Sequence, residues 1–177
     1  MVFQGKEITS YSPRMKVLSG IGYSPDDARI FADLTVEENI HLSIWIRDAA
    51  EVKRIFSLEK IFEIFPAIEK FLNRRGLHLS GGEKKMTSIA RALALNPSLL
   101  LLDEAFEGLS PLVVKHFIEA LSRIRAMGVT ILLGESNVRI ASQIAERSYI
   151  VERGEIIFEG HPRDILENEK LLKIVGR

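Results

Sequence analysis

Apolar residues form short continuous runs that alternate with stretches of helical spacing. The leucine run at 99–102 and the mostly apolar stretches at 21–23 and 129–133 are flanked by turn residues, which predicts short buried strands. From Val113 to Ile124, apolar residues instead recur every three or four positions, as on one face of a helix. Strands that alternate with helices and are apolar throughout predict an α/β fold with a mostly parallel sheet covered on both faces.

Capping residues predict where several helices begin. Ser12-Pro13 and Ser110-Pro111 each combine an N-cap serine with proline at the first helical position. Thr35 and Glu38 have the spacing of a capping box, and the helix that follows is expected to reach about Ser43.

Residues 35–76 contain no strand pattern and predict a helical region. Asp48 is expected to cap a second helix there, which ends or kinks at Pro66. Its apolar residues recur at helical spacing and are most simply core residues: Val52, Ile55, Phe56, Phe62 and Phe65.

The last thirty residues predict a hairpin followed by one helix. Strand patterns at 148–152 and 155–159 flank Arg153-Gly154, a turn sequence. A single final helix is expected over 163–175.

Composition excludes several classes of function. The 24 basic and 24 acidic residues among 177 cancel, so no net charge attracts nucleic acid or an anionic membrane. There is no cysteine, which excludes disulfides and thiolate metal sites. The longest apolar runs are too short to span a bilayer, and no signal-peptide pattern is present. A single cytoplasmic domain is therefore expected.

The segment Ser80-Gly81-Gly82-Glu83 predicts a helix start with access for an anion. Serine and glutamate form a capping box, so an ordinary helix start is sufficient to explain those two residues. The two glycines weaken the first turn by about 1 kcal/mol each relative to alanine, but they leave its amides uncovered. Lys84 and Lys85 add positive charge nearby, although two lysines on an exposed turn are usually solvated.

The leucine run at 99–102 leads directly into two acids. Four consecutive leucines predict burial on both faces, which places the acids at the carboxyl end of the sheet, where open α/β folds bind ligands. Asp103 is placed to hold a hydrated magnesium ion, and Glu104 to accept a proton from an attacking water. The alternative is that both acids simply cap the next turn.

Together these motifs resemble the ATP-binding subunits of ABC transporters. Residues 79–83 match the signature motif of that family, 101–104 its Walker B motif and 107–111 its D-loop. The resemblance covers essentially the whole chain. Residues 21–26 and 31–39 are most similar to subunits of branched-chain amino acid importers.

The resemblance implies a fold, cofactors and partners. The fold is of the P-loop NTPase class, with a helical lobe at 35–96 inserted into an α/β core at 1–34 and 97–177 that lacks its N-terminal strands. The cofactors are ATP and Mg²⁺. Two subunits enclose ATP head to tail, so the implied partners are a second ATPase subunit and membrane-spanning permease subunits, at the inner face of the cell membrane, and no nucleic acid.

The same resemblance implies roles for individual residues. Glu104 would be the general base and Asp103 the acid at the metal site. Ser80, Gly81, Gly82 and Glu83 would bind the nucleotide of the partner subunit.

Three further positions of the nucleotide site follow from the resemblance. Ser110 lies in the D-loop segment. Asp26 falls where most members carry the Q-loop glutamine, and Ser136 where most carry the switch histidine. Serine cannot carry the charge of histidine, which puts sensing of the γ-phosphate in doubt.

The family's phosphate-binding loop, Gly-x-x-x-x-Gly-Lys-Ser/Thr, is absent from the sequence. The segment from Gly76 to Gly81 has the glycine spacing but is followed by Gly82-Glu83 and no lysine. We therefore expect a chain that begins after this loop and is inactive alone. In the family fold, the strand that leads into this loop lies between the strands at 129–133 and 148–152. Its absence is expected to leave a gap there, which is closed by direct pairing of those two strands or by another polypeptide.

Three functions remain open at this point. The chain could be the C-terminal portion of an importer ATPase, or a catalytically inactive partner that lends its signature motif to an intact ATPase. A non-transporter ABC ATPase is the third alternative, although the chain has neither a coiled-coil insertion nor a second cassette.

Overall fold

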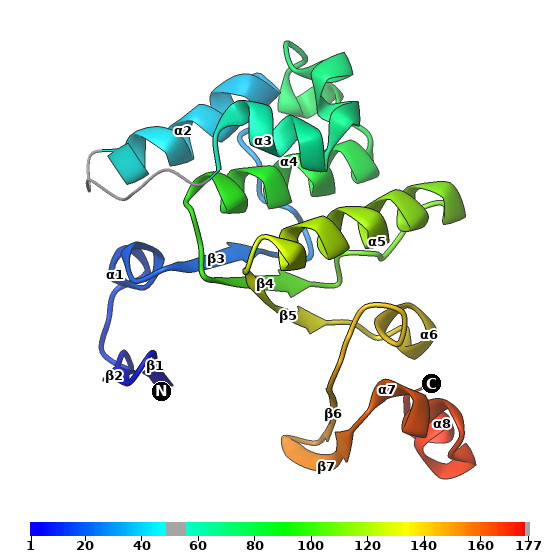
Figure 1. The fold of residues 1–177 in the computed structure, drawn as a ribbon. Coiled ribbons are helices and arrows are strands. Elements are labelled where there is room, and N and C mark those ends of the chain that lie inside the picture. The colour runs from blue at the N-terminus through cyan, green and yellow to red at the C-terminus, as the bar shows by residue number, and fades with distance from the viewer. Residues whose placement is uncertain (49–55, 176–177) are drawn as a thin grey trace.

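A computed structural model describes residues 1–48 and 56–175 (Figure 1). Its strands are β1 (Val2–Phe3), β2 (Lys6–Glu7), β3 (Ile21–Ser24), β4 (Leu99–Asp103), β5 (Thr130–Gly134), β6 (Ser148–Glu152) and β7 (Glu155–Gly160). The α-helices are α1 (Pro13–Leu18), α2 (Val36–Asp48), α3 (Leu58–Ile64), α4 (Gly81–Ala94), α5 (Pro111–Ala126), α6 (Val138–Ala141), α7 (Pro162–Leu166) and α8 (Glu169–Val175). Two short 3₁₀ helices, η1 (Pro66–Phe71) and η2 (Gly76–His78), lie between α3 and α4.

Strands β3, β4 and β5 form the predicted parallel sheet, with β4 in the centre. Tyr23 pairs with Leu101, and Leu101 with Leu132, so all three strands end at the same edge. Helices α4 and α5 lie on one side of this sheet (Figure 1).

Coverage of the sheet on both faces was wrongly predicted. Leu100 and Leu102 point toward the helices and are buried, whereas Tyr23 and Leu132 are 52% and 59% exposed. Alternate residues of a strand point to opposite faces. Because α4 and α5 pack on one side, the leucine run is buried on that side alone.

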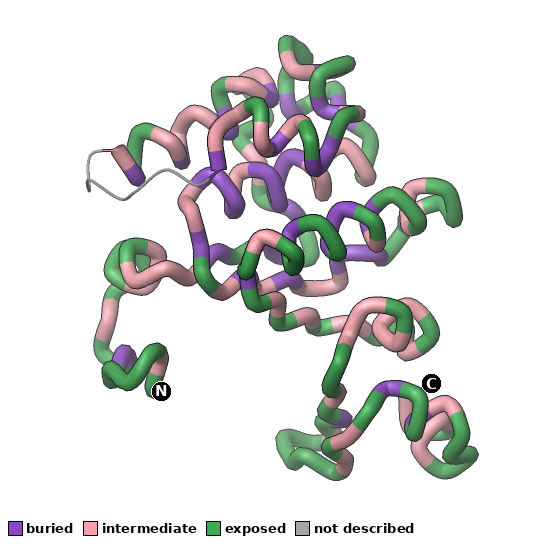
Figure 2. Tube along the Cα trace, in the orientation of Figure 1, coloured by how far each residue is buried: buried purple, intermediate pink, exposed green. Residues whose placement is uncertain are grey.

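The core lies between the sheet and helices α2 to α5. Figure 2 shows buried residues concentrated there, while the hairpin β6–β7 and the last helices are mostly exposed. Within α5, Phe117, Leu121 and Ile124 are fully buried on the predicted face, and Phe117 makes edge-on contacts with Phe65 and Phe106.

Helix α2 is longer than the sequence suggested. The Glu38 carboxylate accepts the Thr35 N–H at 2.7 Å and the Thr35 hydroxyl accepts the Glu38 N–H at 3.2 Å, which confirms the capping box. The helix continues past Ser43 to Asp48, so the prediction that Asp48 caps the following helix was wrong. Ile44, which packs against the core, and the buried Arg47 lie in the added part of the helix and favour it.

Helix α3, which follows α2, is capped by a residue other than Asp48. The Ser57 hydroxyl accepts the Lys60 N–H at 3.3 Å, and α3 ends before Pro66, as predicted. Of the five residues predicted for the core of this segment, two lie outside the described ranges (Val52, Ile55) and three pack in the core (Phe56, Phe62, Phe65).

The predicted hairpin is present, but it does not close the sheet. Strands β6 and β7 pair antiparallel around Arg153-Gly154, whose φ values of 52° and 85° suit the turn. Strand β6 belongs to a different sheet from β5, so these two strands do not pair directly, which was one of the two ways in which the gap was expected to close. In Figure 1 the hairpin stands away from β5, because α6 and the following loop carry the chain off the sheet.

The single helix predicted over 163–175 is two helices, α7 and α8. The Asn168 side-chain oxygen accepts the N–H groups of Lys170 at 3.0 Å and Leu171 at 3.3 Å. An asparagine bonded in this way starts a helix, and it therefore interrupts the longer one.

Candidate functional site

The carboxyl edge of the sheet gathers three of the predicted site residues. Asp103 ends β4 opposite Gly134, and the Glu104 N–H donates to the Gly134 carbonyl at 2.9 Å. The Ser136 hydroxyl in turn donates to Oε2 of Glu104 at 3.0 Å. The carboxylate of Glu104 is therefore oriented by a residue that follows the neighbouring strand.

Tyr23 is a site residue that the sequence did not reveal. Its hydroxyl donates to Oδ2 of Asp103 at 3.4 Å. Partial burial and the negative charge of Asp103 raise the pKa of this hydroxyl, and the charge of Asp26 adds to the effect. Asp26, which is exposed, thus lies close enough to act on the same edge of the sheet. The strand pattern had suggested only that Tyr23 is buried.

Glu135 was also missed. Its Oε1 accepts the Asn137 N–H at 2.9 Å, while Oε2 is buried and has no hydrogen-bond partner within the described residues. Burial raises the pKa of Glu135, and the charge of Glu104 raises it further. One signal could have found it, because Glu135 directly follows a strand, as Asp103 and Glu104 do.

The acidic edge fits a magnesium ion held mainly by a nucleotide. Mg²⁺ is usually bound by one or two carboxylates together with phosphate oxygens and waters. Asp103 offers one such carboxylate, and among the described residues no cluster of three or more acids, histidines or cysteines forms a metal cage. The donor set therefore suits an ion that arrives with phosphate.

The segment at the start of α4 is built as predicted. The Ser80 hydroxyl accepts the Glu83 N–H at 3.4 Å, and the Glu83 carboxylate accepts the Ser80 N–H at 2.8 Å. Arg74 donates to both oxygens of Glu83, at 3.0 and 3.1 Å. Burial acts to raise the pKa of Glu83, but these bonds outweigh it and hold the pKa below its usual range.

This lowered pKa predicts an acid dependence of stability. A carboxyl whose pKa is lowered by folding stabilises the protein above its unfolded pKa of about 4.3, and this contribution is lost as pH falls. The free energy of unfolding should therefore fall between about pH 5 and pH 3 by more in the wild type than in Glu83→Gln. Urea denaturation across that range measures it, and equal slopes would contradict the assigned pKa.

The two glycines of this segment are not required by the packing of the chain. A Cβ added to Gly81 would meet nothing within 4 Å, and one on Gly82 would make ordinary contacts with Leu109 and Val113. Neither glycine has a positive φ. The fold of this chain would therefore accept a side chain at either position.

Ser110 occupies the N-cap of α5, as predicted, but its hydroxyl makes no capping hydrogen bond. Gly108 ahead of it has a φ of 72°, which suits glycine, and Leu109 lies against Gly82. The D-loop segment thus follows the acidic edge and passes beside the start of α4.

Lys85 connects the two halves of the site. Its ammonium donates to the main-chain carbonyl of Glu104. The structure therefore joins the helix that begins at Ser80 to the acidic edge, which the sequence left as two separate motifs.

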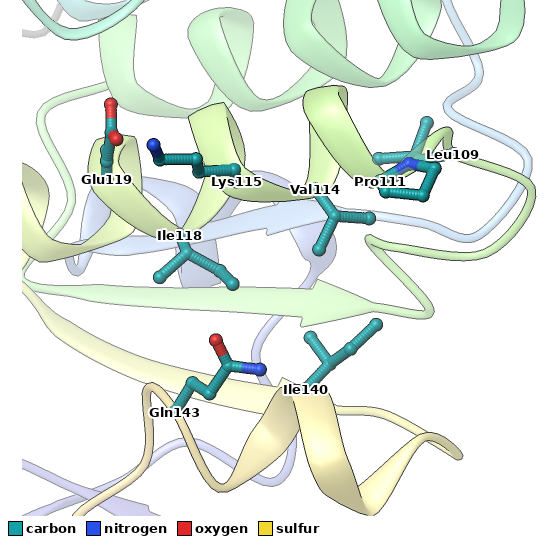
Figure 3. A pocket seen from close by; sticks show the side chains of 8 residues that line it. All are labelled: Leu109, Pro111, Val114, Lys115, Ile118, Glu119, Ile140 and Gln143. Carbon is teal, nitrogen blue, oxygen red and sulfur yellow. The ribbon is translucent and has the colours of Figure 1, made fainter.

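A groove of about 600 Å³ lies elsewhere, between α5 and α6 (Figure 3). It is lined by Leu109, Pro111, Val114, Lys115, Ile118, Glu119, Ile140 and Gln143. None of the predicted site residues is among these.

A parallel sheet with acids at its carboxyl edge, beside a helix that begins with glycines, is the arrangement of a nucleotide-binding α/β protein. The family model described as ABC transporter matches residues 1–107. The chain belongs to the ABC transporter family, as one of its ATP-binding subunits.

Relatives with curated names are similar in sequence to nearly the whole chain. The branched-chain amino acid transport ATP-binding protein BraG of Pseudomonas aeruginosa is 32% identical over 96% of this chain and 72% of its own length. LivF of Archaeoglobus fulgidus, a probable protein of the same kind, is 36% identical with the same coverage. LptB of Haemophilus influenzae, from a lipopolysaccharide export system, is 35% identical over 98% of this chain and 72% of its own length.

Solved structures agree on the fold. The ADP conformation of MJ1267, an ATP-binding cassette of an ABC transporter, superimposes with a TM-score of 0.75 and 25% identity, over 97% of this chain and 74% of that one. Among the residues described here, none of the helices has the length and apolar content that a membrane span requires.

Proposed function

We propose that this subunit contributes its Ser80–Glu83 segment to ATP held mainly by a second ATPase subunit. The observation that carries the proposal is the pair of glycines that the chain's own packing does not need. Uncovered amides at the start of a helix of this length, together with the helix dipole, favour a phosphate group. Ser80 is exposed, so a second subunit can reach it.

The acidic edge would serve the nucleotide on the chain's own side. Asp103 would hold the magnesium ion, whose role is to neutralise charge on the phosphate oxygens. Glu104 would accept a proton from water, with its carboxylate kept in place by Ser136. The sequence holds no phosphate-loop motif, so the isolated chain is expected not to bind ATP measurably.

The proposed process is import of branched-chain amino acids. Two relatives are named for that transport, and residues 21–26 and 31–39 resemble its subunits. Asp26 and the helical region from 35 would contact the permease at the inner face of the membrane. Because relatives named for lipopolysaccharide export match about as well, leucine uptake by cells that depend on the chain separates the two substrates.

Mixing the chain with an intact ATPase subunit tests the proposal. BraG is a suitable partner, because its similarity extends over nearly the whole chain. We expect the chain to raise the rate of ATP hydrolysis by BraG several-fold, and BraG alone at the same total subunit concentration is the control. A rate that the chain leaves unchanged would contradict the proposal.

Gly81→Ala separates the role of the glycine from folding. Alanine fits without a clash and favours a helix by up to about 1 kcal/mol, so the variant should be as stable as the wild type or more so. Its added methyl group would cover the first amides, and the stimulation of BraG should fall. Thermal denaturation and the hydrolysis rate measure both effects; a variant that stimulates fully would contradict a role in phosphate binding.

A further inference from the structure

Glu104 holds an unusual backbone conformation. Its φ is 43°, in the left-handed region that residues other than glycine rarely adopt. Such a conformation persists where the surroundings fix it from several sides. The Gly134 carbonyl, the Ser136 hydroxyl and the Lys85 ammonium all hydrogen-bond to Glu104.

Lys85 is the one of these partners that comes from the helix beginning at Ser80. It lies in the second turn of α4 and is partly buried. Its ammonium reaches the Glu104 carbonyl, which also accepts the Glu107 N–H at 3.2 Å. The contact spans 19 residues of sequence and fixes the loop that follows β4.

The charge of Lys85 suits its surroundings. The carboxylates of Glu104 and Glu135 both lie near this loop, and the positive charge of Lys85 acts to lower the pKa of Glu135. An apolar side chain at this position would leave the Glu104 carbonyl without this donor and the two carboxylates without this cation.

We propose that Lys85 is a positioning residue that couples the start of α4 to the backbone of Glu104. The coupling rests on the proposed function. A partner's nucleotide that binds at Ser80 shifts or restrains the first turn of α4. Lys85 transmits this change to the carbonyl of Glu104. Occupation of one nucleotide site thereby sets the geometry of the acid that serves the other.

Hydrogen exchange on the isolated chain tests the contact itself. In Lys85→Met the amides of residues 104–107 should exchange at least about five-fold faster than in the wild type. Lys84→Met is the matched control, since no side-chain hydrogen bond of Lys84 is found in the part of the chain that the structure describes, and it should leave this segment unchanged. Lys85→Arg keeps a cationic donor and should restore protection.

Two results would overturn the contact. One is an unchanged exchange rate at 104–107 in Lys85→Met. The other is an equal increase throughout the chain, because that marks a general loss of stability. Restoration by Lys85→Arg distinguishes the cationic donor from simple filling of space.

Adding BraG and ATP tests the coupling. Exchange at 104–107 should become slower in the wild type and not in Lys85→Met. Stimulated hydrolysis without this slowing in the wild type would overturn the coupling. Absence of any stimulation would instead contradict the proposed function. Hydrogen exchange on the isolated chain would still test the contact between Lys85 and Glu104.

Discussion

Replacing Ser80 with arginine is expected to abolish the stimulation of BraG by this chain. Ser80 is exposed at the start of α4, and its hydroxyl and N–H both bond to Glu83. An arginine side chain would fill the space above the uncovered amides, where the proposed phosphate binds. The rate of hydrolysis should therefore return to that of BraG alone.

Loss of a helix cap is the competing explanation for that result. Replacing an N-cap serine costs about 0.5–2 kcal/mol of stability in itself. Ser12→Arg is the matched control, because Ser12 is exposed and caps α1 through the Met15 N–H at 3.3 Å. The control should lose a similar stability and keep the stimulation. Equal loss of stimulation in both variants would contradict a specific role for Ser80.

Arg47→Met is expected to cause the largest loss of stability. The side chain of Arg47 is 2% exposed, and its guanidinium donates to the carbonyls of Phe56 at 2.9 Å and Ala94 at 3.1 Å. Ala94 ends α4, so Arg47 joins the end of α2 to the end of the signature helix. Methionine has a similar length but no donors, which leaves buried carbonyls unpaired.

The expected cost is about 3 kcal/mol, a large share of the roughly 5–15 kcal/mol that stabilises a typical domain. Urea denaturation of the purified chain measures the change. Lys60→Met is the control, because Lys60 pairs with Glu63 on the surface and its loss should cost less than about 1 kcal/mol. A similar small cost for Arg47→Met would show that water replaces the lost donors.

Local signals predicted much of the fold correctly. The capping boxes at Thr35 and Ser80 and the turn at Arg153-Gly154 involve residues close in sequence, and the structure confirms each. Burial of the leucine run depends on what packs against each face of the sheet, which a single strand cannot reveal. Helical spacing of apolar residues does not show whether Asn168 continues a helix or caps a new one, so the break there was not predicted.

In the candidate site, too, local features were predicted and long-range contacts were not. Asp103 and Glu104 follow a strong strand pattern, so their place at the edge of the sheet was predicted and observed. Tyr23 and Lys85 reach them through strand register and helix packing, over 80 and 19 residues of sequence. The family resemblance identified the motifs, and the structure added the contacts between them.

A crosslink shows whether the segment that begins at Ser80 faces a nucleotide held by another subunit. The chain has no cysteine, so His78→Cys places a single thiol beside this segment. BraG would carry its own single cysteine in the phosphate-binding loop, and Glu155→Cys on the exposed β7 strand is the control. The disulfide from position 78 is expected to form only with ATP. A yield from position 78 that ATP does not change, or that equals the yield from position 155, would contradict it.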